Sequence, residues 1–136
     1  MTFLDTNVLV YSVDGTDPAK QSAAREIVVS AVRGGDYLIS AQVLNEFSNI
    51  AILKLKLTID ETRKFVSFFS RMNVVPLDHQ WTDPALALKQ NYGIQFFDSL
   101  VLVAAQENGC NEILTEDLND GQMYGSVKAV NPFKGL

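Results

Sequence analysis

The sequence has a single cysteine and a single histidine among its 136 residues. With Cys110 alone, the chain can form no internal disulfide and has no CxxC knuckle for a metal ion. With His79 alone, it cannot build a zinc site on a pair of histidines. We interpret His79, which follows Asp78 near an expected loop, as a surface or packing residue. Disulfide frameworks and His-pair zinc sites are therefore excluded.

Long hydrophobic runs are also absent. The longest, from Leu100 to Ala105, is far too short to cross a bilayer. The first residues, from Met1 to Asp5, contain no basic segment and reach a carboxylate at once, which is unlike a signal peptide. We therefore expect a cytoplasmic protein that has no contact with a membrane.

Basic residues are few. Eleven Lys and Arg stand against 16 Asp and Glu, so the formal net charge is −5. This balance counts against a nucleic-acid binder, because phosphate contacts require Lys and Arg. However, acids that bind divalent cations count as negative in the sequence and much less so in the loaded site. The charge is therefore mild counter-evidence and does not exclude nucleic acid.

What the sequence does contain is enough apolar material for one core. Hydrophobic residues make up 47% of the chain and charged residues only 20%, which argues against disorder. The length fits one domain and leaves little room for a second. We expect residues 1–136 to form a single domain.

Strand-like and helix-like segments alternate along the chain. Two helix starts carry capping residues: Asp17 before Pro18, and a capping box at 58–61. The run 97–108 is apolar on nearly every side, which predicts a buried helix. This order predicts an α/β fold, with a mostly parallel sheet of four to five strands flanked by helices on both faces. The expected strands are 2–4, 37–39, 73–77, 112–115 and 127–130; the expected helices lie at about 18–33, 43–51, 59–72, 84–92 and 97–108.

Four acids stand out by their positions in this pattern. Asp5 ends the first strand, and Asp117 follows the strand at 112–115. Asp98 begins the buried helix, and Glu46 lies at the border of the apolar face of its helix. Sites in open sheets form beyond the carboxyl ends of the strands, where these acids could converge. Packed carboxylates repel one another, and a divalent cation with oxygen ligands relieves that repulsion.

Each acid also has a plain structural interpretation. Asp98 could be a helix N-cap, Asp5 a polar residue closing a strand, and Glu46 a carboxylate on the flank of a helix. Asp117 lies in a stretch, 116–121, that reads as a turn. The hypothesis of a site depends on the four acids together, in this order and on these elements.

The same residues resemble a known family. The segments Leu4-Asp5-Thr6-Asn7-Val8-Leu9, Glu46, Phe97-Asp98-Ser99-Leu100 and Leu114-Thr115-Glu116-Asp117 are similar to the PIN domain. Within that family, the size and spacing resemble the VapC-type toxin ribonucleases of toxin–antitoxin pairs. The resemblance covers nearly the whole chain and is most specific at Asp5-Thr6-Asn7. Near the end, two family positions correspond to Asp117 and Asp120, and either could face the metal. Asp120-Gly121 departs from the Asp-Phe ending common in the family.

The resemblance implies a ribonuclease with Mg²⁺ or Mn²⁺ as its cofactor. The implied metal-binding and catalytic residues are Asp5, Glu46, Asp98 and Asp117, of which Asp5 and Asp98 are the expected direct ligands. The hydroxyls of Thr6 and Thr115 could orient a carboxylate or a phosphate, and Asn7 could do the same or simply shape the turn. The implied partners are an RNA substrate, a small protein antitoxin and a second copy of the chain.

Two other classes of function remain open. The chain could be a catalytically weak PIN-like module that binds RNA or a protein. It could also be an acidic-pocket phosphatase or phospho-acceptor. Phosphatases with an aspartyl nucleophile use a second Asp two positions on, and Asn7 cannot transfer that proton. Receiver domains pair an acceptor Asp with a later Lys, and we find no convincing pair. The stretch 117–121 resembles a calcium loop only faintly, because its glycine is one place early and no Glu closes it.

Overall fold

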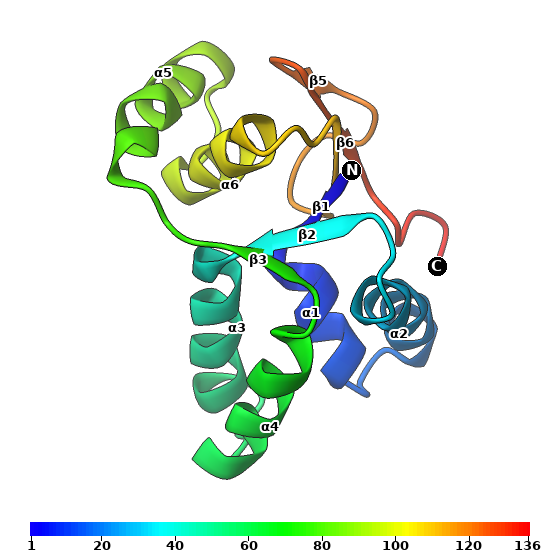
Figure 1. The fold of residues 1–136 in the computed structure, drawn as a ribbon. Helices are drawn as coiled ribbons and strands as arrows, with labels where there is room; N and C mark the ends of the chain where they lie inside the picture. Colours follow the sequence, from blue (N-terminus) through cyan, green and yellow to red (C-terminus); the bar gives the residue numbers. More distant parts are fainter.

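A computed structural model describes residues 1–136 and shows an α/β fold (Figure 1). Six strands form one sheet in the order β3-β2-β1-β4-β6-β5, with every pair parallel except β5 with β6. Helices α1–α4 cover one face and α5 and α6 the other. The predicted fold class is therefore confirmed.

The strands are β1 (Thr2–Leu4), β2 (Tyr37–Ser40), β3 (Asn73–Val75), β4 (Glu112–Leu114), β5 (Met123–Tyr124) and β6 (Val127–Val130). The helices are α1 (Thr6–Val13), α2 (Pro18–Val32), α3 (Ala41–Leu53), α4 (Ile59–Phe69), α5 (Thr82–Tyr92) and α6 (Phe96–Glu107), with a short 3₁₀ turn at His79–Trp81.

Local sequence signals account for several helix boundaries. The Asp17 side chain accepts a hydrogen bond from the backbone N–H of Lys20, and Pro18 occupies the first turn of α2. Thr58 and Glu61 form both hydrogen bonds of the predicted capping box at the start of α4. None of the helices is both long and apolar enough to cross a membrane.

The core lies between the sheet and its two helical layers. The central strands β1 and β4 are shielded on both faces, so Phe3, Leu4 and Ile113 are fully buried. Helix α6 contributes five consecutive buried residues, 101–105, as its apolar composition predicts. Below the sheet, the Phe47 and Phe69 rings pack edge to face with centroids 4.9 Å apart, which joins α3 to α4.

The structure corrects four sequence-based expectations. Helix α1 was not predicted, because its eight residues are rich in valine and follow a strand directly. The sheet has six strands, because the two-residue β5 pairs with β6 in a hairpin. Helix α5 begins at Thr82, before the expected start at residue 84. Helix α6 begins at Phe96 with Gln95 as its N-cap residue, so Asp98 lies in the first turn and is not a cap.

The strand order creates a crevice at one edge of the sheet. From β1 the chain moves outward through β2 to β3, and α5 and α6 then return it to β4 on the other side of β1. Because the direction of winding reverses between β1 and β4, their carboxyl ends open onto a topological switch point. Helices α1 and α3 begin directly after β1 and β2, and α6 begins at this same edge.

Candidate metal centre

A cleft of about 600 Å³ lies at this switch point. Its lining is strongly acidic, and Lys54 is the one basic residue that lines it. Such a concentration of carboxylates is costly unless a cation or protons offset the charge. The acidic lining residues are Asp5, Asp14, Asp17, Glu46, Asp98, Glu116 and Asp117.

Asp5 lies at the bottom of the cleft, where β1 passes into α1. Its side chain is 4% exposed and caps α1, because Oδ1 accepts a 2.8 Å hydrogen bond from the backbone N–H of Thr6. Oδ2 accepts a 2.8 Å hydrogen bond from the Thr115 hydroxyl. Burial raises the pKa of Asp5 to about 7, against the lowering effect of these two hydrogen bonds, and the charges of Asp117 and Asp98 raise it further. A cation beside Asp5 would reverse this shift.

Asp98 reaches the cleft from the first turn of α6. Its side chain is half-buried, and no group of the chain donates a hydrogen bond to its carboxylate. Burial is the largest cause that raises the pKa of Asp98 to about 6, followed by the charges of Asp117 and Glu46. The helix N-terminus favours a negative charge here, but it does not supply a direct partner. Both oxygens of Asp98 thus remain available to a ligand.

Asp117 completes a cluster of three carboxylates. Asp5, Asp98 and Asp117 each place one oxygen so that all three oxygens lie within 4.8 Å of one another. Asp117 is exposed, and its Oδ2 accepts a 3.1 Å hydrogen bond from the Asn7 amide. We refer to these three residues as the carboxylate cluster.

Glu46 lies beside the carboxylate cluster but is not one of its three members. Its position is the predicted border of the α3 apolar face, since its side chain is half-buried while Val43 is fully buried. Glu46 Oε1 accepts hydrogen bonds from the Thr6 hydroxyl at 3.1 Å and from the Gln42 amide at 3.2 Å. Glu46 lines the same cleft and raises the pKa of Asp98, so its charge acts on the cluster.

Thr115 connects the acids of the cluster through its buried hydroxyl. That hydroxyl donates to Asp5 and accepts from the Asn7 amide at 3.2 Å and from the backbone N–H of Asp117 at 3.1 Å. Asn7 Oδ1 is buried and has no hydrogen-bond partner in the chain. Three of the residues expected to support the site, Thr6, Asn7 and Thr115, therefore do contact its carboxylates.

Asp120 lies outside the cleft. Its carboxylate accepts hydrogen bonds from the backbone N–H of Asn131 at 2.8 Å and from Lys134 Nζ at 3.1 Å. These two hydrogen bonds lower the pKa of Asp120. The sequence left open whether Asp117 or Asp120 belongs with the other acids. In the structure, Asp117 lies in the carboxylate cluster, whereas Asp120 is hydrogen-bonded to the C-terminal segment.

Sequence analysis missed two groups near the cleft. One is Gln42, which precedes Glu46 by four residues and therefore shares its helix face, a spacing that could have identified it. The other is at the rim, where Glu116 accepts hydrogen bonds from the Tyr11 hydroxyl at 2.6 Å and from Lys20 at 3.1 Å. No local signal relates Lys20 to Glu116, because they are far apart in the sequence.

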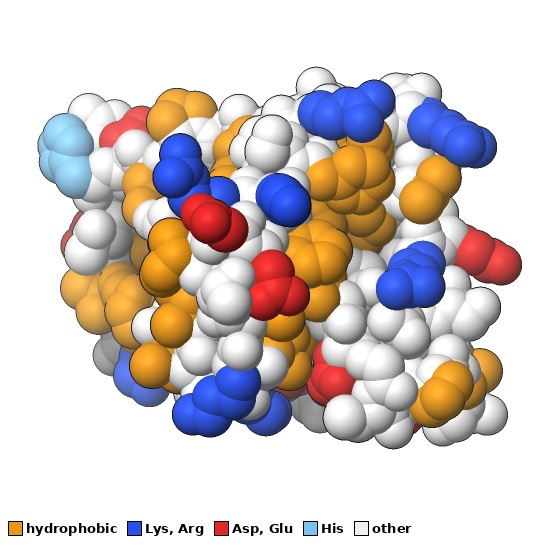
Figure 2. All heavy atoms as spheres, turned by 90° about the horizontal axis from the view of Figure 1, so that it is seen from below, with side chains coloured by type: hydrophobic (Ala, Val, Ile, Leu, Met, Phe, Trp, Pro, Cys, Tyr) orange, Lys and Arg blue, Asp and Glu red, His pale blue; other side chains and the backbone are white.

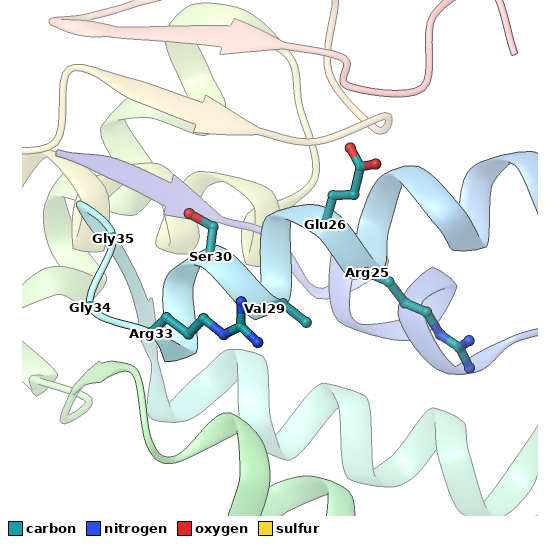
Figure 3. Close-up of a pocket in the computed structure, with 7 residues that line it drawn as sticks. All are labelled: Arg25, Glu26, Val29, Ser30, Arg33, Gly34 and Gly35. Atoms are coloured by element: carbon teal, nitrogen blue, oxygen red, sulfur yellow. The ribbon is translucent and has the colours of Figure 1, made fainter.

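A second hollow, of about 650 Å³, follows α2 and the turn after it (Figure 3). Arg25 and Arg33 extend along one side of the helix there, while Glu26 points to the other side. This surface has a single carboxylate and no cluster of ligand atoms. The acidic cleft is therefore the candidate site on chemical grounds.

The donor set of the cleft suits a hard divalent cation. Carboxylate oxygens are the preferred ligands of Mg²⁺ and Mn²⁺, and neither thiols nor imidazoles are present. The Asp98 oxygens without hydrogen-bond donors and the unpartnered Asn7 Oδ1 are the unsatisfied acceptors that such a site requires. The cluster can therefore hold a cation, and the cation would relieve the repulsion among its acids.

Comparison with known proteins identifies relatives of this fold. Several solved structures share the fold at low sequence identity. One is a chain of a toxin–antitoxin complex from Klebsiella pneumoniae, at 20% identity and a TM-score of 0.73, with 97% of this chain and 98% of that chain covered. Another is VapC20 of Mycobacterium tuberculosis, described as a toxin that cleaves the sarcin–ricin loop. It has 14% identity and a TM-score of 0.68, and the match covers 83% of this chain and 87% of that chain. A chain of VapBC from Salmonella typhimurium, solved bound to DNA, has 17% identity and a TM-score of 0.67. The match covers 94% of this chain and 95% of that chain.

A search among curated proteins gives no match. The sequence does match the PIN domain over residues 2–121, a range that includes both central strands of the sheet, Glu46 and all three members of the carboxylate cluster. The chain therefore belongs to the PIN domain family.

Proposed function

We propose that this protein is a Mg²⁺- or Mn²⁺-dependent endoribonuclease and the toxin of a toxin–antitoxin pair. The observation that carries the proposal is the carboxylate cluster at the switch point, where oxygens of Asp5, Asp98 and Asp117 lie within 4.8 Å of one another. Nuclease chemistry on a phosphodiester needs charge neutralisation at the phosphate and an activated water, and a divalent cation supplies both when bound.

The residues of the cleft have different roles in this proposal. Asp5 and Asp98 would hold the cation, with Asp117 and Glu46 completing the site directly or through water. Thr115 and the N–H of Thr6 fix the Asp5 carboxylate, and the Asn7 amide orients Asp117. These hydrogen bonds mean that Asp5 and Asp117 need little rearrangement on binding, which is what pre-organisation requires.

The charge of the cleft explains why metal dependence should be strict. Seven acidic residues line the cleft, and an RNA backbone would be repelled by them in the absence of cations. Lys54, which pairs with no carboxylate, is the one cation in the lining that could contact a phosphate. Bound metal therefore serves substrate binding as well as chemistry in this proposal.

A protein partner and a second copy of the chain belong to the same proposal. The related structures include a toxin–antitoxin complex and a VapBC complex of Rickettsia felis bound to a promoter fragment. The second has 16% identity and a TM-score of 0.65, and the match covers 94% of this chain and 96% of that chain.

Hydrophobic side chains gather on the face formed by α1–α4, with Lys and Arg side chains around them (Figure 2). A groove of about 210 Å³ on this face is lined by Val13, Val28, Val29, Phe65, Phe68, Phe69, Ser12 and Arg25. An apolar groove of this kind favours a protein partner, and we propose a small antitoxin for it.

Cleavage of a labelled single-stranded RNA tests the proposal. We expect cleavage with Mn²⁺ or Mg²⁺ and none in EDTA. Asp98→Asn should reduce the rate by about a hundredfold or more, because loss of a ligand charge forfeits several kcal/mol of stabilisation. Asp83→Asn is the matched control, since Asp83 is an exposed acid in the first turn of α5.

Four outcomes would contradict parts of the proposal in different ways. Full activity in EDTA would exclude the metal-dependent mechanism. Metal binding without cleavage of any RNA would favour a module that only binds RNA or protein. Phosphoryl transfer from acetyl phosphate to the chain would instead favour a phospho-acceptor. The protein encoded by the neighbouring reading frame should bind the chain and inhibit cleavage, and failure to do so would remove the antitoxin from the proposal.

A further inference from the structure

Gln42 connects two segments that carry acids of the site. It lies in the first turn of α3 and is only 6% exposed, which is unusual for a glutamine. Its Nε2 atom donates one hydrogen bond to Glu46 Oε1 and another to the backbone carbonyl of Phe97, each 3.2 Å long. Phe97 is the residue immediately before Asp98.

The chemistry of the two partners explains why an amide occupies this position. A carboxylate oxygen and a backbone carbonyl can only accept hydrogen bonds, so the group between them must donate twice. The NH₂ group of an uncharged side-chain amide does so. The reverse orientation of the Gln42 amide would place its oxygen against both acceptors, so these contacts also fix the orientation of the amide.

The hydrogen bond to Glu46 determines which of its oxygens is free. Oε1 accepts from both Thr6 and Gln42, whereas no group of the chain donates to Oε2. Two donors on one oxygen hold the carboxylate plane in one orientation and leave the other oxygen available to a ligand. The hydrogen bond to Phe97 joins α3 to the first turn of α6, a helix that lies on the opposite face of the sheet (Figure 1).

We propose that Gln42 is a positioning residue that holds Glu46 and Asp98 in register across the acidic cleft. The proposal rests on the proposed metal-dependent function, because the relative position of Glu46 and Asp98 matters only if both act on the same metal ion. Groups that orient metal ligands commonly contribute ten- to a hundredfold to metal affinity or activity when they are removed. Gln42 touches neither metal nor substrate in this proposal and acts only through the two segments that it joins.

Mn²⁺ affinity of the purified protein, measured by calorimetric titration, tests this role. Gln42→Met removes both donors and retains the length of the side chain, and we expect Mn²⁺ binding about ten- to a hundredfold weaker than in the wild type. Gln42→Ser removes the same hydrogen bonds with different packing and should show the same direction. Gln21→Met, at a half-buried glutamine of α2 outside the cleft, should leave the affinity unchanged.

A double-mutant cycle separates positioning from a general structural role. If Gln42 acts through Glu46, then Gln42→Met should weaken Mn²⁺ binding much less in a Glu46→Gln background than in the wild type. In RNA cleavage at Mn²⁺ concentrations that saturate both proteins, Gln42→Met should lower kcat while the KM for RNA stays within about twofold of the wild type.

The outcomes distinguish this inference from the proposed function. A wild type that binds Mn²⁺ and cleaves RNA, beside Gln42 variants with unchanged Mn²⁺ affinity, would overturn the role of Gln42 alone. Fully additive effects of Gln42→Met and Glu46→Gln would also overturn it. A wild type that binds no Mn²⁺ would overturn both proposals.

Discussion

Replacing Asp98 by Asn should stabilise the metal-free protein at neutral pH. The Asp98 carboxylate receives no hydrogen bond from the chain, so the substitution removes no favourable contact. It does remove a charge that is partly desolvated and repelled by Asp117 and Glu46. Loss of a charged side chain in the first turn of a helix would ordinarily be slightly destabilising, so an increase in stability would indicate that burial and repulsion of the Asp98 charge outweigh its attraction to the helix N-terminus.

The pKa of Asp98 gives the size and pH dependence of this effect. Its pKa rises from 3.8 to about 6 on folding, and a shift of two units is worth about 3 kcal/mol. Because Asp98 is only half-buried, we reduce this to about 1 kcal/mol, or roughly 3–4 °C in melting temperature for a chain of this length. The folded protein binds the proton more tightly than the unfolded chain, so the wild type loses stability as the pH rises from about 4 to about 6. The variant should therefore melt like the wild type near pH 4 and about 3–4 °C above it at pH 7 and beyond.

Thermal melts in EDTA at several pH values, followed by circular dichroism, provide the assay. Asp83→Asn, at an exposed first-turn position of α5, should lower the stability by a few tenths of a kcal/mol or leave it unchanged. Millimolar Mn²⁺ should raise the melting temperature of the wild type more than that of Asp98→Asn. If Asp98→Asn melts at or below the wild type near pH 8, burial and the neighbouring acids do not disfavour the Asp98 charge as the structure implies.

Further predictions concern metal, RNA and packing. Because the pKa of Asp5 is about 7 in the metal-free protein, Mn²⁺ affinity should increase with pH up to about 7, and binding near pH 6 should release protons; calorimetry in two buffers of different ionisation enthalpy would detect that release. Reversing the charges of Lys54 and Lys56 together should weaken RNA binding and reduce its salt slope by about 1.4 if each contacts one phosphate, as measured by fluorescence anisotropy; an unchanged slope would place the RNA elsewhere. Thr115→Val leaves buried polar groups unpaired around Asp5 and should cost about 1–3 kcal/mol in urea denaturation. Phe47→Ala should cost about 3–5 kcal/mol in the same assay, because Phe47 is fully buried between α3 and α4, and a much smaller loss would argue against this packing.

The cluster of acids was predictable from the four positions taken together, and not from any one of them, because each acid alone also fits a cap, a turn or a helix flank. Asp5 ends an apolar run, and Glu46 lies between apolar residues at helical spacing. In an alternating α/β chain, the carboxyl ends of parallel strands lie at one edge of the sheet, so topology predicted that Asp5 could lie near an acid that follows the strand at 112–115. The structure places Asp5 and Asp117 there together with Asp98.

Features that depend on distant contacts were not predictable in this way. The choice between Asp117 and Asp120 depends on Lys134 and Asn131, which reach Asp120 only after the C-terminal segment folds back. Strand β5 has two residues and exists only because β6 pairs with it. Helix α1 is short and valine-rich, so its composition favours a strand, and tertiary packing overrides that preference.

The position of β4 has a consequence for when the carboxylate cluster forms during synthesis of the chain. Strand β4 lies between β1 and β6, although it is made from the last quarter of the chain. Until it is synthesised, β1 has an open edge along the side that β4 later covers, and exposed edges of this kind promote association between chains. Thr115 and Asp117 arrive with β4, so the nascent protein has no complete carboxylate cluster during most of its synthesis. A chain truncated before residue 112 should therefore aggregate and bind no metal, even though it retains Asp5, Glu46 and Asp98.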